Sequence, residues 1–514
     1  MTYTAITIGP IYDTISLTSS PAGLWAASYM FSHVSRRLCE LICDKLLINR
    51  EEDILSPFFC KDKQIFDGIG RYHDHIIFKP ANGEAVLPEL QTLFTQIAKE
   101  LAAVFRGDTA EWFRQYLQLH AICYDVAEGG NPILACSKYL DAIELEKTFP
   151  TVAAVSPLAD LLDSKNDDRN IRIRDSIRNS FSAGVWPFPK YYTKEGRERL
   201  PDMADITGRS TETTRPRRKI KSYYAIVQSD GDNFGDYINK LTAATLEETE
   251  RAIRDFSEKC LDYCTESARL VTEYGGVPIY AGGDDLLFIA PLEGKNGDTL
   301  LKLLAGLRKK FDETFYKTDG DPTLSLGVAI RYYKYPLYEA FGEAYAMLNS
   351  RAKKTKNAAA ISLQKHSGQS PEFVLESFKD GALTGKLEEL IKLHTGDDVL
   401  HSIQSKLREF EKLFRHALEV GGGDSLKNLF DNTFDSEIHK NHAKLLQQAY
   451  ELLDEIKPPQ TLVEALTDEY KRLHEERTEA QINSEVRLKT LDSLLRFAKF
   501  WGEEGDDGDE KAAD

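Results

Sequence analysis

Two short apolar segments flank the tetrapeptide Gly282-Gly-Asp-Asp285 and restrict how this part of the chain can fold. The flanking segments, Gly276–Tyr280 and Leu286–Ala290, have the composition of β-strands. Glycine reaches backbone conformations closed to other residues, so the tetrapeptide predicts the tight turn of a β-hairpin that leaves room for a ligand. The two carboxylates at its tip are oxygen ligands of the kind that hard cations such as Mg²⁺ bind. Taken alone, the segment is also typical of an ordinary surface hairpin.

A second acidic segment lies upstream and changes this interpretation. The β-rich run Ser222–Gln228 leads directly into Ser229-Asp-Gly-Asp-Asn-Phe-Gly235. An acid at the end of a strand, followed by a glycine-bearing turn into a helix, presents a carboxylate to a metal ion and backbone N–H groups to phosphate. Asp230 on a strand, then a helix, then an acidic hairpin is the order of a palm-type nucleotidyl-transfer site. In such sites two metal ions about 4 Å apart activate a hydroxyl and stabilise the leaving pyrophosphate.

These motifs and three further segments occur in one order over residues 222–368, and together they carry a resemblance. The further segments are Leu324–Ile330, Tyr335–Phe341 and Arg351–Asn357. In this respect the chain resembles the large, polymerase-like subunit of type III CRISPR interference complexes, in its Cmr-type form. The resemblance implies an α+β fold with two ferredoxin-like palm domains, related to nucleotidyl cyclases, and helical intervening and C-terminal domains.

The resemblance also implies a set of site residues. Asp230, Asp284 and Asp285 would be catalytic and would bind Mg²⁺ or Mn²⁺, and Asp232 could support them. The residues expected to contact the nucleotide are Gly231, Asn233, Phe234, Gly235, Gly282, Gly283, Lys353 and Lys356. The family's Ala-Lys-x-x-Gly-(Lys/Arg)-Asn motif is one residue shorter here and lacks its glycine, so Lys356 is the closer match and Lys353 the weaker one. Both lysines would also complement a helix C-terminus without any ligand.

The implied function is nucleotidyl transfer from ATP. By resemblance, the chain would work with other subunits of a type III complex, a CRISPR guide RNA and a target RNA in the cytoplasm, and would make a cyclic oligoadenylate second messenger. Some relatives instead join AMP to S-adenosylmethionine, and the motifs do not choose between the acceptors. A catalytically silent scaffold and a free-standing enzyme like the diguanylate cyclases are alternatives. Against the latter, Leu286 follows the acidic pair where that family usually has phenylalanine.

Patterns along the chain predict five parts. They are a degenerate first palm (1–128), a mainly helical part with a linker (129–215), the catalytic second palm (216–371), a helical C-terminal domain (372–500) and an acidic, disordered tail (501–514).

Within the first palm, Gly68–Pro80 is interpreted as the counterpart of the acidic hairpin. Its His73-Asp74 pair raises the question of an HD nuclease domain, which many relatives carry. Because the pair lies beside strand residues and such a domain takes its ligands from several helices, we expect an exposed hairpin and no metal-dependent cleavage of single-stranded DNA.

Composition excludes several classes of protein. A net charge of −17 argues against a chain that wraps nucleic acid by itself, although the basic segment Arg215–Lys221 could contact RNA or be a solvated linker. The seven cysteines contain no Cys-x-x-Cys pair, so reduced thiols are expected and a zinc site is not. No run of eighteen apolar residues exists, and the segment Met1–Ile8 has the pattern of a strand and not of a signal peptide.

Overall fold

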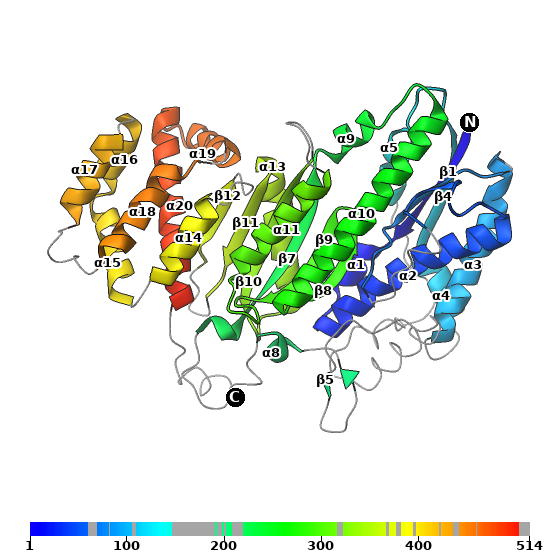
Figure 1. Cartoon of the computed structure of the whole chain (residues 1–514), viewed down its shortest axis with the longest axis horizontal. Helices are drawn as coiled ribbons and strands as arrows, with labels where there is room; N and C mark the ends of the chain where they lie inside the picture. The colour runs from blue at the N-terminus through cyan, green and yellow to red at the C-terminus, as the bar shows by residue number, and fades with distance from the viewer. Residues whose placement is uncertain are drawn as a thin grey trace.

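The computed structural model (Figure 1) describes most of the 514 residues. The described ranges are 1–59, 69–81, 83–104, 109–145, 191–192, 198–199, 202–207, 219–315, 322–365, 370–376, 382–393, 397–420, 423–434, 442–458 and 460–502. Most of the expected helical part and linker at 129–215, residues 215–218 of the basic segment and residues 503–514 of the expected tail lie outside them.

The N-terminal part folds around an antiparallel four-stranded sheet with the order β2-β3-β1-β4. Its strands are β1 (Thr2–Gly9), β2 (Ile54–Ser56), β3 (His75–Phe78) and β4 (Gln118–Asp125). Its helices are α1 (Ile11–Ser16), α2 (Pro21–Leu46), η1 (Gly83–Ala85), α3 (Val86–Val104), α4 (Ala110–Tyr116) and α5 (Pro132–Glu144). Helix α2 starts where the Ser20 side chain accepts a hydrogen bond from the Gly23 N–H, with Pro21 in its first turn.

The second sheet has six strands in the order β12-β11-β10-β7-β9-β8. They are β7 (Tyr223–Asp232), β8 (Val277–Gly282), β9 (Asp285–Pro291), β10 (Thr323–Tyr332), β11 (Ala358–Leu363) and β12 (Glu372–Glu376). The βαββαβ order with an added helix and strand, which the sequence predicts, is present. Strand β12 pairs with β11 as well, so the sheet continues past the expected boundary at residue 371.

Helices cover both faces of the second sheet. They are α9 (Phe234–Lys240), α10 (Leu246–Tyr274), α11 (Leu300–Phe315), α12 (Leu337–Met347), the π-helix η4 (Leu348–Ala352) and α13 (Lys353–Thr355). Helix α10 begins with its Thr245 cap and ends at Gly275, whose φ of 108° a residue with a side chain rarely adopts. Shorter elements outside the palms are β5 (Tyr191–Tyr192), β6 (Glu198–Arg199), α8 (Met203–Ile206) and η3 (Lys219–Ser222). Helix α8 therefore interrupts the stretch expected to be a linker.

Strand β7 is buried on both faces because alternate side chains enter different cores. Tyr223, Ala225 and Val227 pack with α10 and α11. Tyr224 and Ile226 pack instead with α12 and with helix α2 of the first palm. The strand that carries Asp230 thus packs in two hydrophobic cores, one of which includes the first palm.

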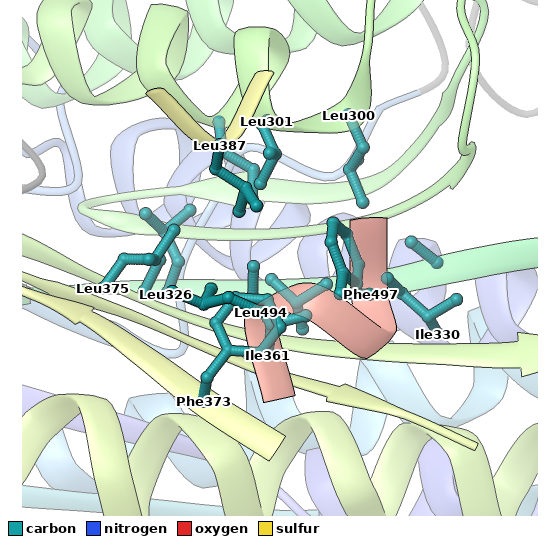
Figure 2. Packing of buried hydrophobic residues seen from close by; sticks show 14 of the residues in the cluster. Leu300, Leu301, Leu326, Ile330, Ile361, Phe373, Leu375, Leu387, Leu494 and Phe497 are labelled. Carbon is teal, nitrogen blue, oxygen red and sulfur yellow. The ribbon is translucent and has the colours of Figure 1, made fainter. Parts of the chain in front are cut away.

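The C-terminal helices form one core with the second palm. They are α14 (Ala382–Leu393), α15 (Asp397–Glu409), α16 (Glu411–Val420), α17 (Gly423–Thr433), α18 (Ala443–Glu455), α19 (Gln460–Arg472) and α20 (Glu479–Gly502). Figure 2 shows Leu494 and Phe497 of α20 among side chains of the sheet and of α11 and α14. Trp501 is only 2% exposed, so the expected tail does not begin at residue 501.

The two palms are related by their strand order and by their mutual packing. The series β2-β3-β1-β4 matches β8-β9-β7-β10 strand for strand. Helix α2 of the first palm packs on β8, and helix α10 of the second packs on β2. A hydrogen bond of 2.8 Å from the Ala281 N–H to the Gly70 carbonyl joins the palms beside the acidic hairpin. The two palms therefore face each other across a cleft.

No helix within the described ranges combines the length and the apolar character needed to cross a membrane.

Candidate active site

The acidic hairpin has the geometry that its two glycines predict. Gly282 pairs with Asp285 across the turn, and Gly283 has a φ of +69°. A Cβ atom at Gly282 would lie 2.2 Å from the Tyr280 hydroxyl oxygen, a distance that real structures do not tolerate. The turn conformation therefore requires glycine at 283, and the Tyr280 side chain leaves no room for a Cβ atom at 282.

The structure brings the three predicted acids together. Strand β7 pairs with β9 up to Ser229 opposite Leu286, so Asp230 emerges beside the hairpin tip. Carboxylate oxygens of Asp230, Asp284 and Asp285 all lie within 4.8 Å of one another. The Asp284 carboxylate also accepts a hydrogen bond of 3.0 Å from the Gly231 N–H, which fixes its position against the C-terminal end of β7.

Burial and neighbouring carboxylates alter the pKa values of the two hairpin acids. Burial, followed by the nearby charge of Asp230, raises the pKa of Asp284 to about 7. Asp285 is exposed to solvent within the cleft, yet the surrounding protein and the charges of Asp284 and Asp230 raise its pKa well above the usual range. An all-oxygen donor set with an excess of negative charge fits a divalent cation such as Mg²⁺ or Mn²⁺.

Both predicted lysines reach this site, and the weaker sequence match lies closer to the acids. Lys353 Nζ lies 2.6 Å from Asp230 Oδ2 and donates to the Gly231 carbonyl at 2.5 Å. Lys356 Nζ donates to Asn233 Oδ1 at 2.6 Å. Asn233, with a φ of 61°, caps the short helix α9. The lysines therefore stand beside the turn that the sequence predicts to bind phosphate.

Asp232 stabilises the backbone around the site through buried hydrogen bonds. Its side chain is buried and accepts hydrogen bonds from Thr323 Oγ1 at 2.7 Å, from Ser325 Oγ at 2.8 Å and from the Asn357 N–H at 2.9 Å. These bonds tie the end of β7 to β10 and to the turn that holds Lys356. Asp232 is thus a positioning residue, since it is absent from the group of converging carboxylates.

We expect Asp232→Asn to lower the free energy of unfolding by about 1–3 kcal/mol, because an amide cannot accept all of these hydrogen bonds. Displacement of the Lys356 turn should also weaken ATP binding. Chemical denaturation followed by circular dichroism measures the first effect. Asp236→Asn, at an exposed acid on α9, is the matched control and should change the unfolding free energy little. An unchanged midpoint for Asp232→Asn would contradict the assigned role.

Phe234 mainly packs inside the palm. Its ring centroid lies 5.3–5.8 Å from those of Phe256, Phe311 and Phe315. A Cβ atom at Gly231 would lie 1.9 Å from the Phe234 ring, so this glycine is needed for the ring to close over the turn. Gly235, the next residue, is exposed at the start of α9. Of the residues predicted to contact a nucleotide, Phe234 has a clear packing role.

A cavity of about 650 Å³ lies between the palms next to the acids, a volume suited to a nucleotide-sized ligand. Asp230 and Asp285 line it from the second palm. Its other wall, from the first palm, includes Tyr12, Ser32 and Asp74.

The position of His73 and Asp74 corrects an expectation. The predicted exposed hairpin is wrong at this point, since both residues are half-buried. His73 Nε2 lies 3.1 Å from Ser56 Oγ, and burial lowers the pKa of His73 to about 4. Asp74 faces the cavity with Asp285. The signal for this was available in the likeness of Asp74-His75-Ile-Ile-Phe78 to Asp284-Asp285-Leu-Leu-Phe288.

Comparison with known proteins places the second palm in a family. Residues 223–361 match the model of the Cas10/Cmr2 second palm domain. A curated relative, the CRISPR system Cmr subunit Cmr2 of Pyrococcus furiosus (strain ATCC 43587 / DSM 3638 / JCM 8422 / Vc1), is 32% identical over 169 residues. That match covers 28% of this chain and 19% of the relative, so the chain matches only a small part of the relative's length.

Solved structures extend the likeness to the whole fold. A Csm1–Csm4 cassette in complex with cA4 is similar with a TM-score of 0.51 at 14% identity, covering 98% of this chain and 70% of that chain. The apo type III-B Cmr-beta structure gives a TM-score of 0.54 at 12% identity, covering 84% of this chain and 77% of that chain. At these identities the likeness shows a common fold. The family match therefore applies to the second palm, residues 223–361, and the solved structures add a common fold for the rest of the chain.

Proposed function

We propose that the chain catalyses metal-dependent nucleotidyl transfer from ATP and, in a type III effector complex that has bound target RNA, makes a cyclic oligoadenylate messenger. One observation carries this proposal. Three carboxylates, from the end of β7 and from the hairpin of β8 and β9, converge at a glycine turn beside a nucleotide-sized cavity that both palms line. This arrangement is more than a scaffold requires, because like charges held together destabilise a fold unless a cation compensates them.

In the proposed reaction, different residues of the chain bind the metal ions, the triphosphate and the two substrates. Mg²⁺ or Mn²⁺ ions, when bound, lower the pKa of an attacking hydroxyl and stabilise charge on the transferred phosphate. Asp230, Asp284 and Asp285 would hold these ions. Lys353 and Lys356 would release their present partners and donate to the triphosphate. The two palm walls would hold two substrates in a fixed orientation, which converts a bimolecular reaction into an effectively unimolecular one.

Similar proteins support ATP as the substrate. Solved Csm1–Csm4 cassettes contain AMPPNP, pppApA or cA4 in their complexes. We extend this to the present chain as part of the proposal, together with the guide RNA, the target RNA and the neighbouring subunits. S-adenosylmethionine as the acceptor of AMP remains the second proposal from the same site.

Removal of either lysine should raise the KM for ATP about tenfold or more, because each would lose a charge-assisted hydrogen bond to the triphosphate worth about 1.5–3 kcal/mol. Lys353→Ala should also alter the metal dependence, since Lys353 contacts Asp230 directly. Lys354→Ala is the matched control, at an exposed lysine between them. Steady-state kinetics over a range of ATP and Mn²⁺ concentrations separates the effects. If all three variants have the same KM for ATP, Lys353 and Lys356 do not bind the triphosphate.

The proposal is tested with radiolabelled ATP on the RNA-bound complex, with and without S-adenosylmethionine. A product from ATP alone that disappears in the Asp284→Ala/Asp285→Ala variant supports the oligoadenylate reaction. A product formed only with S-adenosylmethionine assigns the chain to the conjugating reaction. With an intact complex and verified target RNA, no product in either condition would favour a silent scaffold.

A further inference from the structure

The strand registers place a second group of metal-ligating side chains at the position in the first palm that the acids occupy in the second. Strand β3 begins at His75 as β9 begins at Asp285. Thr7 of β1 pairs with His75, while the register of β7 with β9, continued by one residue, sets Asp230 opposite Asp285. Thr7, Asp74 and His75 therefore stand where the second palm has Asp230, Asp284 and Asp285.

Thr7 has no carboxylate, unlike Asp230 at the equivalent position of the second palm. Glu144, at the end of helix α5, provides a carboxylate there instead. Glu144 Oε1 accepts hydrogen bonds from Thr7 Oγ1 at 2.7 Å and from His75 Nε2 at 2.6 Å. One ligand atom each from Asp74, His75 and Glu144 lies within 4.8 Å of the other two. Thr7 thus orients a carboxylate beside an imidazole, as an outer-shell partner does in metal sites.

A fourth side chain adds an independent observation. His120 of β4 also pairs with Thr7, so His75, Thr7 and His120 form a cross-strand row on one face of the sheet. The Nε2 atom of His120 is buried and has no hydrogen-bond partner within the described protein. Buried polar atoms nearly always have a partner, so an unsatisfied imidazole nitrogen one strand from the group requires an explanation.

We propose that Asp74, His75 and Glu144 bind a divalent cation on the first-palm wall of the cleft, with His120 as a nearby additional donor. Asp74 and Glu144 line the same cavity as Asp230 and Asp285, so the cation would face the ligand space. A mixed set of imidazole and carboxylates favours Mn²⁺ or Zn²⁺ over Mg²⁺, which prefers oxygen ligands.

A simple ion pair between His75 and Glu144 is the competing explanation. It accounts for the 2.6 Å contact. It leaves unexplained the convergence of Asp74 on the pair, the unsatisfied His120 nitrogen and the correspondence with the acids of the second palm. A cation would use Asp74, His75 and Glu144 together, with His120 on the neighbouring strand.

The test uses Mn²⁺ as the probe and the full chain with Asp230, Asp284 and Asp285 all changed to asparagine, which removes the first site. After EDTA treatment and desalting, Mn²⁺ titration followed by electron paramagnetic resonance should find about one bound ion per chain. Pulsed measurements should show coupling to a ¹⁴N nucleus, because His75 supplies a nitrogen ligand. Adding His75→Gln should abolish this coupling and weaken binding at least about tenfold, and Glu144→Gln should weaken it similarly.

His416→Gln is the matched control, because His416 lies on an exposed helix face 3.9 Å from Glu419, and no third metal-ligating side chain joins them among the described residues. It should leave the bound Mn²⁺ and its ¹⁴N coupling unchanged. Asp74→Asn provides a second variant if His75→Gln proves unstable in thermal melts. Absence of bound Mn²⁺ in the folded triple variant, or binding that His75→Gln and Asp74→Asn leave intact, would overturn the proposal. The readout is independent of ATP turnover, so it stands apart from the proposed function.

Discussion

Changing Asp284 and Asp285 together to asparagine should lower ATP turnover by at least about a hundredfold, because the hairpin would keep its shape and lose the charges proposed to hold metal ions. The loss should appear in kcat, since in the proposed reaction the carboxylates would act at the reacting phosphate and not on the distant parts of the nucleotide. Product formation from radiolabelled ATP measures it. Asp236→Asn, at an exposed acid on the following helix, should retain activity.

The single change Asp284→Asn should stabilise the metal-free protein, with a defined pH dependence. The pKa of Asp284 in the folded chain is about 7, above its usual value, so ionisation opposes folding. This destabilisation is absent below about pH 4, grows as the pH rises and is complete above about pH 7. In EDTA, Asp284→Asn should therefore melt higher than the unchanged chain at pH 8 and close to it at pH 4.

Two results would contradict this account of the acids. Full ATP turnover in the double asparagine variant would show that Asp284 and Asp285 are not catalytic. A melting temperature that falls at pH 8 would show that the carboxylates stabilise the hairpin without metal.

Trp501→Ala should lower the free energy of unfolding by about 3–5 kcal/mol, the usual cost of removing a buried tryptophan from a core. The indole lies 5.3 Å from the Phe497 ring, which in turn lies 5.2 Å from Phe373 of β12. Phe500, the residue before Trp501, packs edge-on against Tyr223 of β7, and their ring centroids are 4.7 Å apart. Loss of the indole should therefore loosen the second palm as well as helix α20. Urea denaturation followed by fluorescence and circular dichroism measures the change.

Two controls separate packing from mere hydrophobicity. Leu473→Ala removes a side chain that is 57% exposed and should change the unfolding free energy by less than about 0.5 kcal/mol. Trp501→Phe keeps part of the ring contact and should fall between the two. If Trp501→Ala unfolds with the same midpoint as Leu473→Ala, the C-terminal helices are not part of the palm's core.

The sequence was sufficient for the parts of the fold that local chemistry determines. Alternating apolar residues mark β7, glycines mark the turn before Asp284, and a threonine cap marks the start of α10. The convergence of Asp230 with the hairpin followed from the order of these elements, because a β-hairpin can pair with a preceding strand in few ways.

Other features depend on contacts between distant segments. Asp74 was expected on an exposed hairpin, and it lies in the cleft because the second palm covers it. Glu144 reaches Thr7 from the end of α5, a proximity that no spacing indicates. Strand β12 was missed because it is five residues long and is followed by helices. Lys353 proved closer to Asp230 than Lys356 because the π-helix η4 changes the rotation of the residues that follow it.

The double-sided burial of β7 also affects how this chain can be synthesised. Tyr224 and Ile226 complete the core of the first palm, although more than 200 residues of chain precede them. During synthesis, the first palm therefore leaves the ribosome before β7. Until β7 has been synthesised, the apolar surface that Tyr224 and Ile226 cover stays exposed to solvent. Pairing at such separations in sequence is slow. Nascent chains that stop before β7 should need a chaperone to remain unaggregated, and a split between the palms should give two insoluble halves.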